Sequence, residues 1–179
     1  MAHKVLGGWQ VSGITTFQTG TPFSIVNQAS YSDNGGVGTF HGSGSFADLV
    51  GNPRESPPSK FIQGIPGPLL FNPNAYAAPR GLTFGNSGRN SLRNPRHTNF
   101  DIALLKHLPI SEARQLEFRA EAFNIFNHTQ WAGINNGLNC YGGPSNSAGD
   151  AQCIAASNFL HPSSAHRARV LQLGLKFIF

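Results

Sequence analysis

Apolar and polar residues alternate along four stretches of the chain, with exceptions at Ile14, Leu105 and Lys106. These stretches cover residues 8–25, 98–108, 114–126 and 167–179. A period of two residues, carried by many aromatic and β-branched side chains, predicts β-strands with one apolar and one polar face. Each stretch matches or exceeds the roughly 9–11 residues that a strand needs to cross a membrane, whereas strands of soluble proteins average about 5–6 residues.

The stretch 114–126 alternates most clearly. Its apolar positions are Leu116, Phe118, Ala120 and Ala122, and its polar positions are Gln115, Glu117, Arg119 and Glu121. The parity slips at 123–126, which predicts a bulge near the membrane edge. A helix over 111–126 with Ser111 as its N-cap is the alternative. A helix would point Phe118 away from the apolar side, so the strand is favoured.

The segments 27–96 and 127–166 lack this periodicity and are rich in Gly, Pro, Ser and Asn, which predicts loops. Loops of this length are unusual in a compact soluble domain but typical of the outer side of an outer-membrane barrel. The sequence therefore predicts an all-β fold. We expect an antiparallel meander of about four long transmembrane strands with two long extracellular loops, forming the last part of a larger outer-membrane β-barrel.

A soluble β-sandwich would produce the same alternation, with the apolar face turned towards a core. The corresponding alternative function is a soluble or surface β-rich binding module for carbohydrate or protein. Trp131 and Tyr141 would be its contact residues. A small complete barrel of about 8 strands would need further strands within 27–96, where the prolines argue against them.

The amino-acid composition argues against a disordered segment and against a nucleic-acid-binding protein. The chain is 39% hydrophobic and 12% charged and contains 14 phenylalanines, which is unlike a disordered segment. The net charge is +5. Several arginines lie in the long predicted loop without a nucleic-acid-binding motif around them, so we expect no nucleic-acid partner. These are Arg80, Arg89, Arg93 and Arg96.

The sequence contains few residue patterns that could support catalysis or metal binding. The sequence has no G-x-S-x-G motif, and its seven histidines, among them His97, His107 and His128, show no metal-ligand spacing. We therefore expect no enzyme activity, no metal site and no cofactor. Cys140 and Cys153 do not form a C-x-x-C pair, so they are either a disulfide within a loop or two free thiols.

Charged residues on the polar faces of the predicted strands are candidates for the barrel lumen. They are expected to pair across neighbouring strands, with His107 as a further partner. These residues are Asp101, Glu117, Arg119, Glu121 and Lys176.

The closing stretch 168–179 resembles the assembly signal of bacterial outer-membrane proteins, in which a terminal Phe follows apolar residues at alternate positions. The matching residues are Leu171, Leu173, Leu175, Phe177 and Phe179. Three further stretches, 8–23, 84–90 and 118–128, are similar to barrel segments of TonB-dependent receptors of the Oar-like group.

This resemblance implies a receptor that imports or binds an extracellular ligand through a barrel of about 22 strands filled by an N-terminal plug. It also implies location in the bacterial outer membrane, with the membrane lipid and the barrel-insertion machinery as partners. The sequence contains no plug, TonB-contacting segment or signal peptide. We therefore expect a C-terminal fragment that works with the remainder of the barrel and plug, and with the TonB system through an N-terminal part.

Overall fold

The computed structural model describes residues 6–27, 46–57, 59–77, 84–138 and 158–179. The chain divides into two compact units. Unit 1 comprises Met1–Gln18, Arg96–Gln130 and His166–Phe179, and unit 2 comprises Thr19–Pro95 and Trp131–Ala165. Cys140, Cys153 and Tyr141 lie outside the described residues, so the structure does not test whether the two cysteines form a disulfide or are free thiols.

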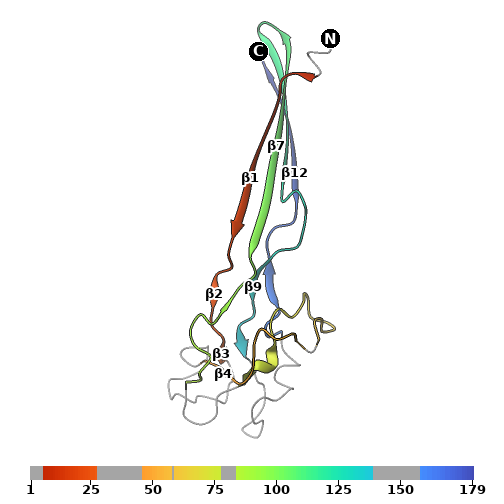
Figure 1. Cartoon of the computed structure of the whole chain (residues 1–179). Helices are drawn as coiled ribbons and strands as arrows, with labels where there is room; N and C mark the ends of the chain where they lie inside the picture. The colour runs from red at the N-terminus through yellow and green to blue at the C-terminus, as the bar shows by residue number, and fades with distance from the viewer. Residues whose placement is uncertain (1–5, 28–45, 58, 78–83, 139–157) are drawn as a thin grey trace. The chain divides into compact units, whose positions relative to one another are not determined.

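Unit 1 is a four-stranded antiparallel sheet with the strand order β1-β7-β8-β12. Figure 1 shows its long strands lying side by side. The strands are β1 (Trp9–Gln18), β7 (His97–Ser111), β8 (Arg114–Phe123) and β12 (Val170–Ile178). Each long strand pairs with the next long strand along the chain, which is a meander. The predicted all-β antiparallel meander is thus confirmed.

Two strand ends differ from the expected bounds. The first strand ends at Gln18 rather than near residue 25, and β8 ends at Phe123 rather than at residue 126. Asn124 adopts a left-handed conformation with φ 54°, which ends the extended backbone. The slip in parity at 123–126 therefore marks a turn after the strand and not the predicted bulge.

The other two long strands also shift at their ends. β7 is 15 residues long and extends to Ser111, beyond the predicted end at 108. Its pairing with β8 is irregular between Pro109 and Ser111, next to the turn at 112–113. β12 begins at Val170, three residues after the predicted start. The helix considered for 111–126 does not form.

The register of the sheet places the apolar faces of all four long strands together. One row runs Val11, Leu104, Ala120 and Leu173 from strand to strand. A parallel row on the same face runs Gly13, Ile102, Ala122 and Leu171. Because a shift of one residue would reverse a strand's faces, this agreement fixes the pairing.

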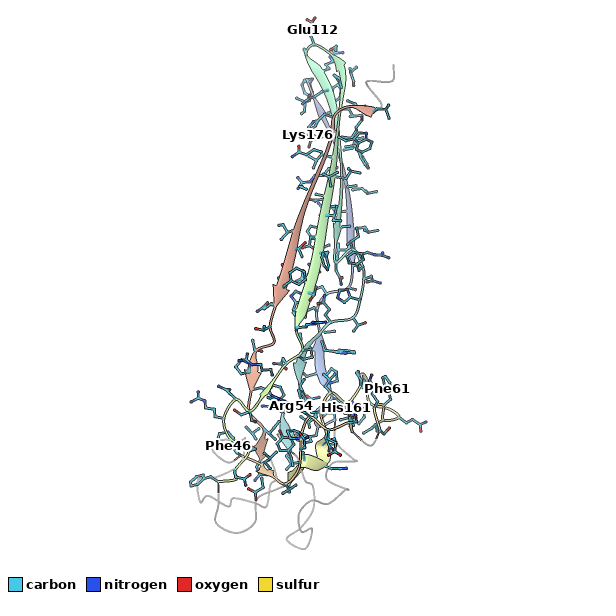
Figure 2. The ribbon with its side chains drawn as sticks, viewed as in Figure 1. Phe46, Arg54, Phe61, Glu112, His161 and Lys176 are labelled. Carbon is cyan, nitrogen blue, oxygen red and sulfur yellow. The ribbon has the colours of Figure 1, made fainter. Side chains whose placement is uncertain are left out.

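The connections at the two ends of the sheet differ greatly in length. The short turn between β7 and β8 lies at one end, with Glu112 at its tip pointing away from the sheet (Figure 2). The C-terminus lies at this same end (Figure 1). The two long connections both leave the sheet at the opposite end, after Gln18 and after Phe123.

Unit 2 is built from those long connections, which the sequence predicts as loops. It contains four small two-stranded sheets, β10-β3, β11-β9, β2-β6 and β4-β5, in the described part of the chain. The bounds are β2 (Pro22–Phe23), β3 (Val26–Asn27), β4 (Asp48–Leu49), β5 (Tyr76–Ala77), β6 (Leu92–Arg93), β9 (Trp131–Ile134), β10 (Gly137–Leu138) and β11 (Pro162–Ala165), with one 3-10 helix, η1 (Pro73–Ala75).

A small hydrophobic core holds unit 2 together. Tyr76 and Phe159 meet edge to face, with ring centroids 6.0 Å apart. The other buried core residues are Ile25, Ala47, Leu69, Ala75, Leu92, Ile134, Leu138 and Leu160. The core residues come from scattered positions along the chain, singly or as the adjacent pairs Ala75–Tyr76 and Phe159–Leu160, so no periodic pattern predicts them. The long connections are therefore partly packed structure rather than only loop.

Candidate functional site: the two faces of the sheet in unit 1

The apolar face of the sheet is largely uncovered. Val11 on β1 is 71% exposed and Leu173 on β12 is 73% exposed. Leu171, Leu175 and Phe177 continue this exposed surface along β12. A contiguous apolar surface on a folded sheet is costly in water and marks a region that contacts lipid or a partner.

Aromatic side chains gather at both ends of this apolar face. Phe17 and Phe126 each meet Phe100 edge to face, at centroid distances of 5.8 and 5.1 Å, towards the end with the long connections. Trp9 and Phe177 lie towards the other end. Trp9 and Phe17 are eight residues apart, or about 27 Å along a strand. This spacing, reduced by strand tilt, resembles the roughly 25 Å apolar band of an outer-membrane barrel between its aromatic girdles.

Lys106 is a charged residue that the register places on this face, opposite Trp9 on β1 and Phe118 on β8. Its side chain is only 5% exposed, and its Nζ donates a hydrogen bond to the carbonyl oxygen of Gly7. The long aliphatic part of lysine covers apolar surface while the ammonium group reaches a polar partner at the edge. The break in alternation at Lys106 is thereby explained.

The opposite face is mostly polar, with Ile14 and Leu105 as apolar exceptions. The register places all five charged residues predicted for the lumen on it, together with His107. His107, Glu117 and Lys176 form one cross-strand row. His107 Nδ1 lies 3.7 Å from Glu117 Oε2, and Arg119 Nη2 lies 2.5 Å from Glu121 Oε1 on the same strand. Such pairs contribute little stability where water reaches them, but they make this face unsuited to lipid.

Asp101 anchors the end of the polar face from which the long connections leave. Its Oδ1 accepts hydrogen bonds from Asn99 Nδ2 at 2.7 Å and from the backbone N–H of Asn124 at 2.9 Å. The second bond holds the turn that ends β8 against β7. The alternation of the strand identifies Asp101 but not its two asparagine partners, which lie near the start of β7 and just after the end of β8.

Three further residues lie at this end of the face, and no sequence pattern connects them: Gln130, His97 and His166. The side-chain oxygen of Gln130 accepts a hydrogen bond from the Thr98 backbone N–H at 2.5 Å. The backbone carbonyl oxygen of Gln130 accepts one from the His166 backbone N–H at 2.8 Å. The rings of His97 and His166 stack with centroids 4.0 Å apart and an interplanar angle of 22°. Burial, and secondly the neighbouring His97, lowers the pKa of His166 below that of a free imidazole.

The residues of the predicted assembly signal lie together on β12 and just beyond it. Leu171, Leu173, Leu175 and Phe177 share the apolar face, and the ring of Phe179 stacks on Phe177 at a centroid distance of 5.9 Å. The structure shows their common face but does not test recognition by the insertion machinery.

No helix among the described residues is long and apolar enough to span a membrane. No group of three or more His, Cys, Asp or Glu side chains is arranged to hold a metal ion in that part of the chain.

A family model described as an outer membrane beta barrel domain matches residues 1–172. The chain belongs to this family. It is therefore an outer-membrane β-barrel protein located in the bacterial outer membrane, as the sequence predicted. No curated protein and no solved structure matches the chain. The family assignment agrees with the uncovered apolar face and its aromatic ends, because an outer-membrane barrel turns such a face to lipid.

Proposed function

We propose that this chain forms the C-terminal barrel strands of a TonB-dependent outer-membrane receptor that takes up or binds an extracellular ligand. The observation that carries the proposal is the two-faced sheet, with an exposed apolar face and a polar face that bears paired charges. Residues 8–23, 84–90 and 118–128, which resemble barrel segments of the Oar-like group, support the receptor class.

The edges of the sheet support a larger barrel. Among the long strands described, β1 pairs only with β7 and β12 pairs only with β8. Four strands cannot close a membrane barrel, since the smallest have about 8. We infer that the remaining barrel strands and a plug complete the receptor, with the barrel-insertion machinery needed for assembly and TonB contacted through an N-terminal part.

In this arrangement the polar face lines the lumen. Asp101, Glu117, Arg119, Glu121 and Lys176 would then face water or the plug. The ends of β1 and β8, from which the long connections leave, would be extracellular, and the turn at Glu112 would be periplasmic. Short periplasmic turns and longer extracellular connections are the rule for these barrels. The absence of enzymatic activity, metal, cofactor and nucleic-acid partner stays a prediction.

Fractionation of the bacterium that encodes the chain tests the location and size of the protein. An antibody to residues 50–57 should detect an antigen that is extracted from outer membranes only with detergent and that migrates faster before boiling than after. Its mass should exceed the 19.2 kDa of this chain. Recovery from the soluble fraction without detergent would overturn the proposal and favour the soluble or surface binding module.

A second measurement tests the receptor class. The detergent-extracted protein should bind the purified periplasmic domain of TonB, and removal of the segment that contacts TonB should abolish this binding. A heat-modifiable barrel that does not bind TonB would remain an outer-membrane protein of this family but would contradict the receptor proposal.

A further inference from the structure

A recess of about 430 Å³ lies at the end of the sheet where Asp101 anchors the turn after β8. It is formed entirely by residues of unit 1. Its volume is at the lower end of the range of about 300–1,000 Å³ that is typical of small-molecule sites. The lining residues that matter here are Asp101, Phe123, Asn124, Gln130, His166 and Val170.

Two side chains that line the recess carry polar atoms without a hydrogen-bond partner. Asn124 and Gln130 are each 7% exposed, and the unpartnered atoms are Asn124 Oδ1 and Gln130 Nε2. The other end of each amide is engaged, since Asn124 Nδ2 donates to the Arg167 carbonyl at 3.2 Å and Gln130 Oε1 accepts from Thr98. Burying a polar atom without a hydrogen-bond partner is unfavourable, so such atoms usually have a partner.

The two unpartnered atoms are one acceptor and one donor. A hydroxyl group both donates and accepts, so a ligand with several hydroxyl groups can satisfy both atoms. Both hydrogen bonds to Asp101 fall on Oδ1. Its Oδ2 is therefore the oxygen that can accept from a further ligand hydroxyl.

The charges around the recess indicate a neutral ligand. Its charged and titratable lining groups are Asp101, Arg167, His97 and His166. The carboxylate and the guanidinium balance each other, and the lowered pKa of His166 keeps that imidazole neutral at pH 7. A neutral ligand leaves this balance unchanged, whereas an ionic ligand would add a net charge where water is partly excluded, which is unfavourable.

The apolar side chains and flat rings in the lining indicate that the ligand also has apolar surface. The register aligns Phe123 on β8 with Val170 on β12, and the stacked rings of His97 and His166 add flat surface. Sugars present C–H groups on the faces of the ring and hydroxyl groups at its rim. We propose that this recess binds one sugar unit of a neutral, polyhydroxylated ligand. The inference rests on the proposed function and names the class of the extracellular ligand.

Binding can be measured with the detergent-extracted outer-membrane protein that carries this chain. Maltose serves as the neutral probe, and glucuronate and glucosamine serve as anionic and cationic controls. Imidazole NMR signals of His97 and His166 report on the recess, and isothermal titration reports the affinity. We expect saturable binding of maltose that shifts both imidazole signals, with at least about tenfold weaker binding of the charged probes.

Substitutions at two neighbouring positions test whether maltose binds in the recess or elsewhere on the sheet. Val170→Trp fills the recess and should abolish maltose binding. Leu171→Trp puts the same ring on the opposite, apolar face and should leave binding unchanged. Heat modifiability checks that both variants fold. If Val170→Trp does not fold, Asp101→Asn replaces it and should weaken binding at least about tenfold, because a hydrogen bond to a charged acceptor is stronger than one to a neutral amide.

Each result of these binding measurements supports or contradicts the proposed sugar site. No binding of maltose, or binding unaffected by Val170→Trp and Asp101→Asn, would mean that the recess holds only water and would overturn the site. Tighter binding of glucuronate or glucosamine would overturn the ligand class. A protein that fails to bind TonB but binds maltose in the recess would refute the receptor proposal and leave the sugar site standing.

Discussion

Lys106 Nζ lies 4.7 Å from the centroid of the Trp9 ring, and the two residues are direct partners in the register of β7 and β1. The ammonium group thus sits over an aromatic face while it donates to Gly7. An amphipathic ring and a long cationic chain are both suited to the boundary between hydrocarbon and water. The pair places this boundary near Trp9.

A double-mutant cycle tests the Trp9–Lys106 pair. Trp9→Leu should reduce the free energy of unfolding by about 0.5–2 kcal/mol more in the natural protein than in a Lys106→Met background, because only the natural protein has the cation–π contact. The measurement is urea unfolding from lipid bilayers. Additive effects of the two substitutions would contradict the contact.

Leu173→Arg tests the assignment of the apolar face to lipid. It would put a charge near the middle of the bilayer and should cost about 2–4 kcal/mol of folding free energy in the same unfolding assay. Gln172→Arg is the matched control, because Gln172 faces the polar side opposite Glu121. Equal costs at the two positions would show that lipid does not cover the apolar face.

Phe179→Ser tests the predicted assembly signal. Phe179 is 92% exposed and lies beyond the end of β12, so its loss should slow insertion into the membrane and change the stability of the folded protein little. Pulse-chase labelling with a heat-modifiability readout measures the rate. Ile178→Ser, which changes the neighbouring residue of opposite parity, should assemble at close to the normal rate. Unaltered assembly of Phe179→Ser would argue against the signal.

His161 makes the stability of unit 2 dependent on pH. Its side chain is fully buried, with Nδ1 3.2 Å from the Gly67 carbonyl oxygen and Nε2 unpartnered. Burial lowers the pKa of His161, although the Gly67 carbonyl opposes this effect. The folded state then binds fewer protons than the unfolded state below the free-histidine pKa of about 6.5, so stability falls as the pH drops below that value.

Hydrogen exchange at the backbone amide of Leu160, corrected for intrinsic rates, measures this effect. The amide donates to Asn135 in unit 2. Protection should decrease as the pH falls from 6.5 towards the folded pKa of His161. In His161→Gln the pH dependence should be absent over this range, even though the variant is less stable. An unchanged pH profile in the variant would assign the effect to another group.

Two glycines of the stretch 84–90 provide a test of packing in unit 2. Gly85 and Gly88 have φ angles of 73° and 76°. A Cβ atom at Gly85 would lie 2.1 Å from the Phe46 carbonyl oxygen, whereas a Cβ at Gly88 would meet nothing within 4 Å. Gly88→Ala should therefore cost only the backbone strain of about 1–2 kcal/mol. Gly85→Ala should lower the free energy of unfolding clearly more than Gly88→Ala. Hydrogen exchange at the backbone amide of Ser87 measures this difference.

The sequence predicted the sheet because each long strand obeys a local rule. Alternation of side chains, as at Leu116 to Ala122, requires only that one face meets an apolar medium and the other a polar one. The same rule placed Glu117, Arg119 and Lys176 on one face before their pairing was known. It failed at strand ends, where the left-handed Asn124 stops the strand although apolar residues continue.

Unit 2 and the recess could not be predicted in the same way. Tyr76 and Phe159 are far apart in the chain, and neither belongs to a periodic pattern, so their contact depends on tertiary packing. The recess likewise joins Asn124, Gln130 and His166, which are ordinary turn residues by sequence. Only the pairing of β7, β8 and β12 brings them next to Asp101.

The shared register of the four long strands also limits how this protein can change in evolution. Insertion or deletion of a single residue within β7 would reverse the faces of every later residue in that strand, whereas the same event in the connections would leave the sheet intact. Length variation among homologues should therefore concentrate between Gln18 and His97 and between Phe123 and Val170. The strands themselves should vary by substitution that preserves parity.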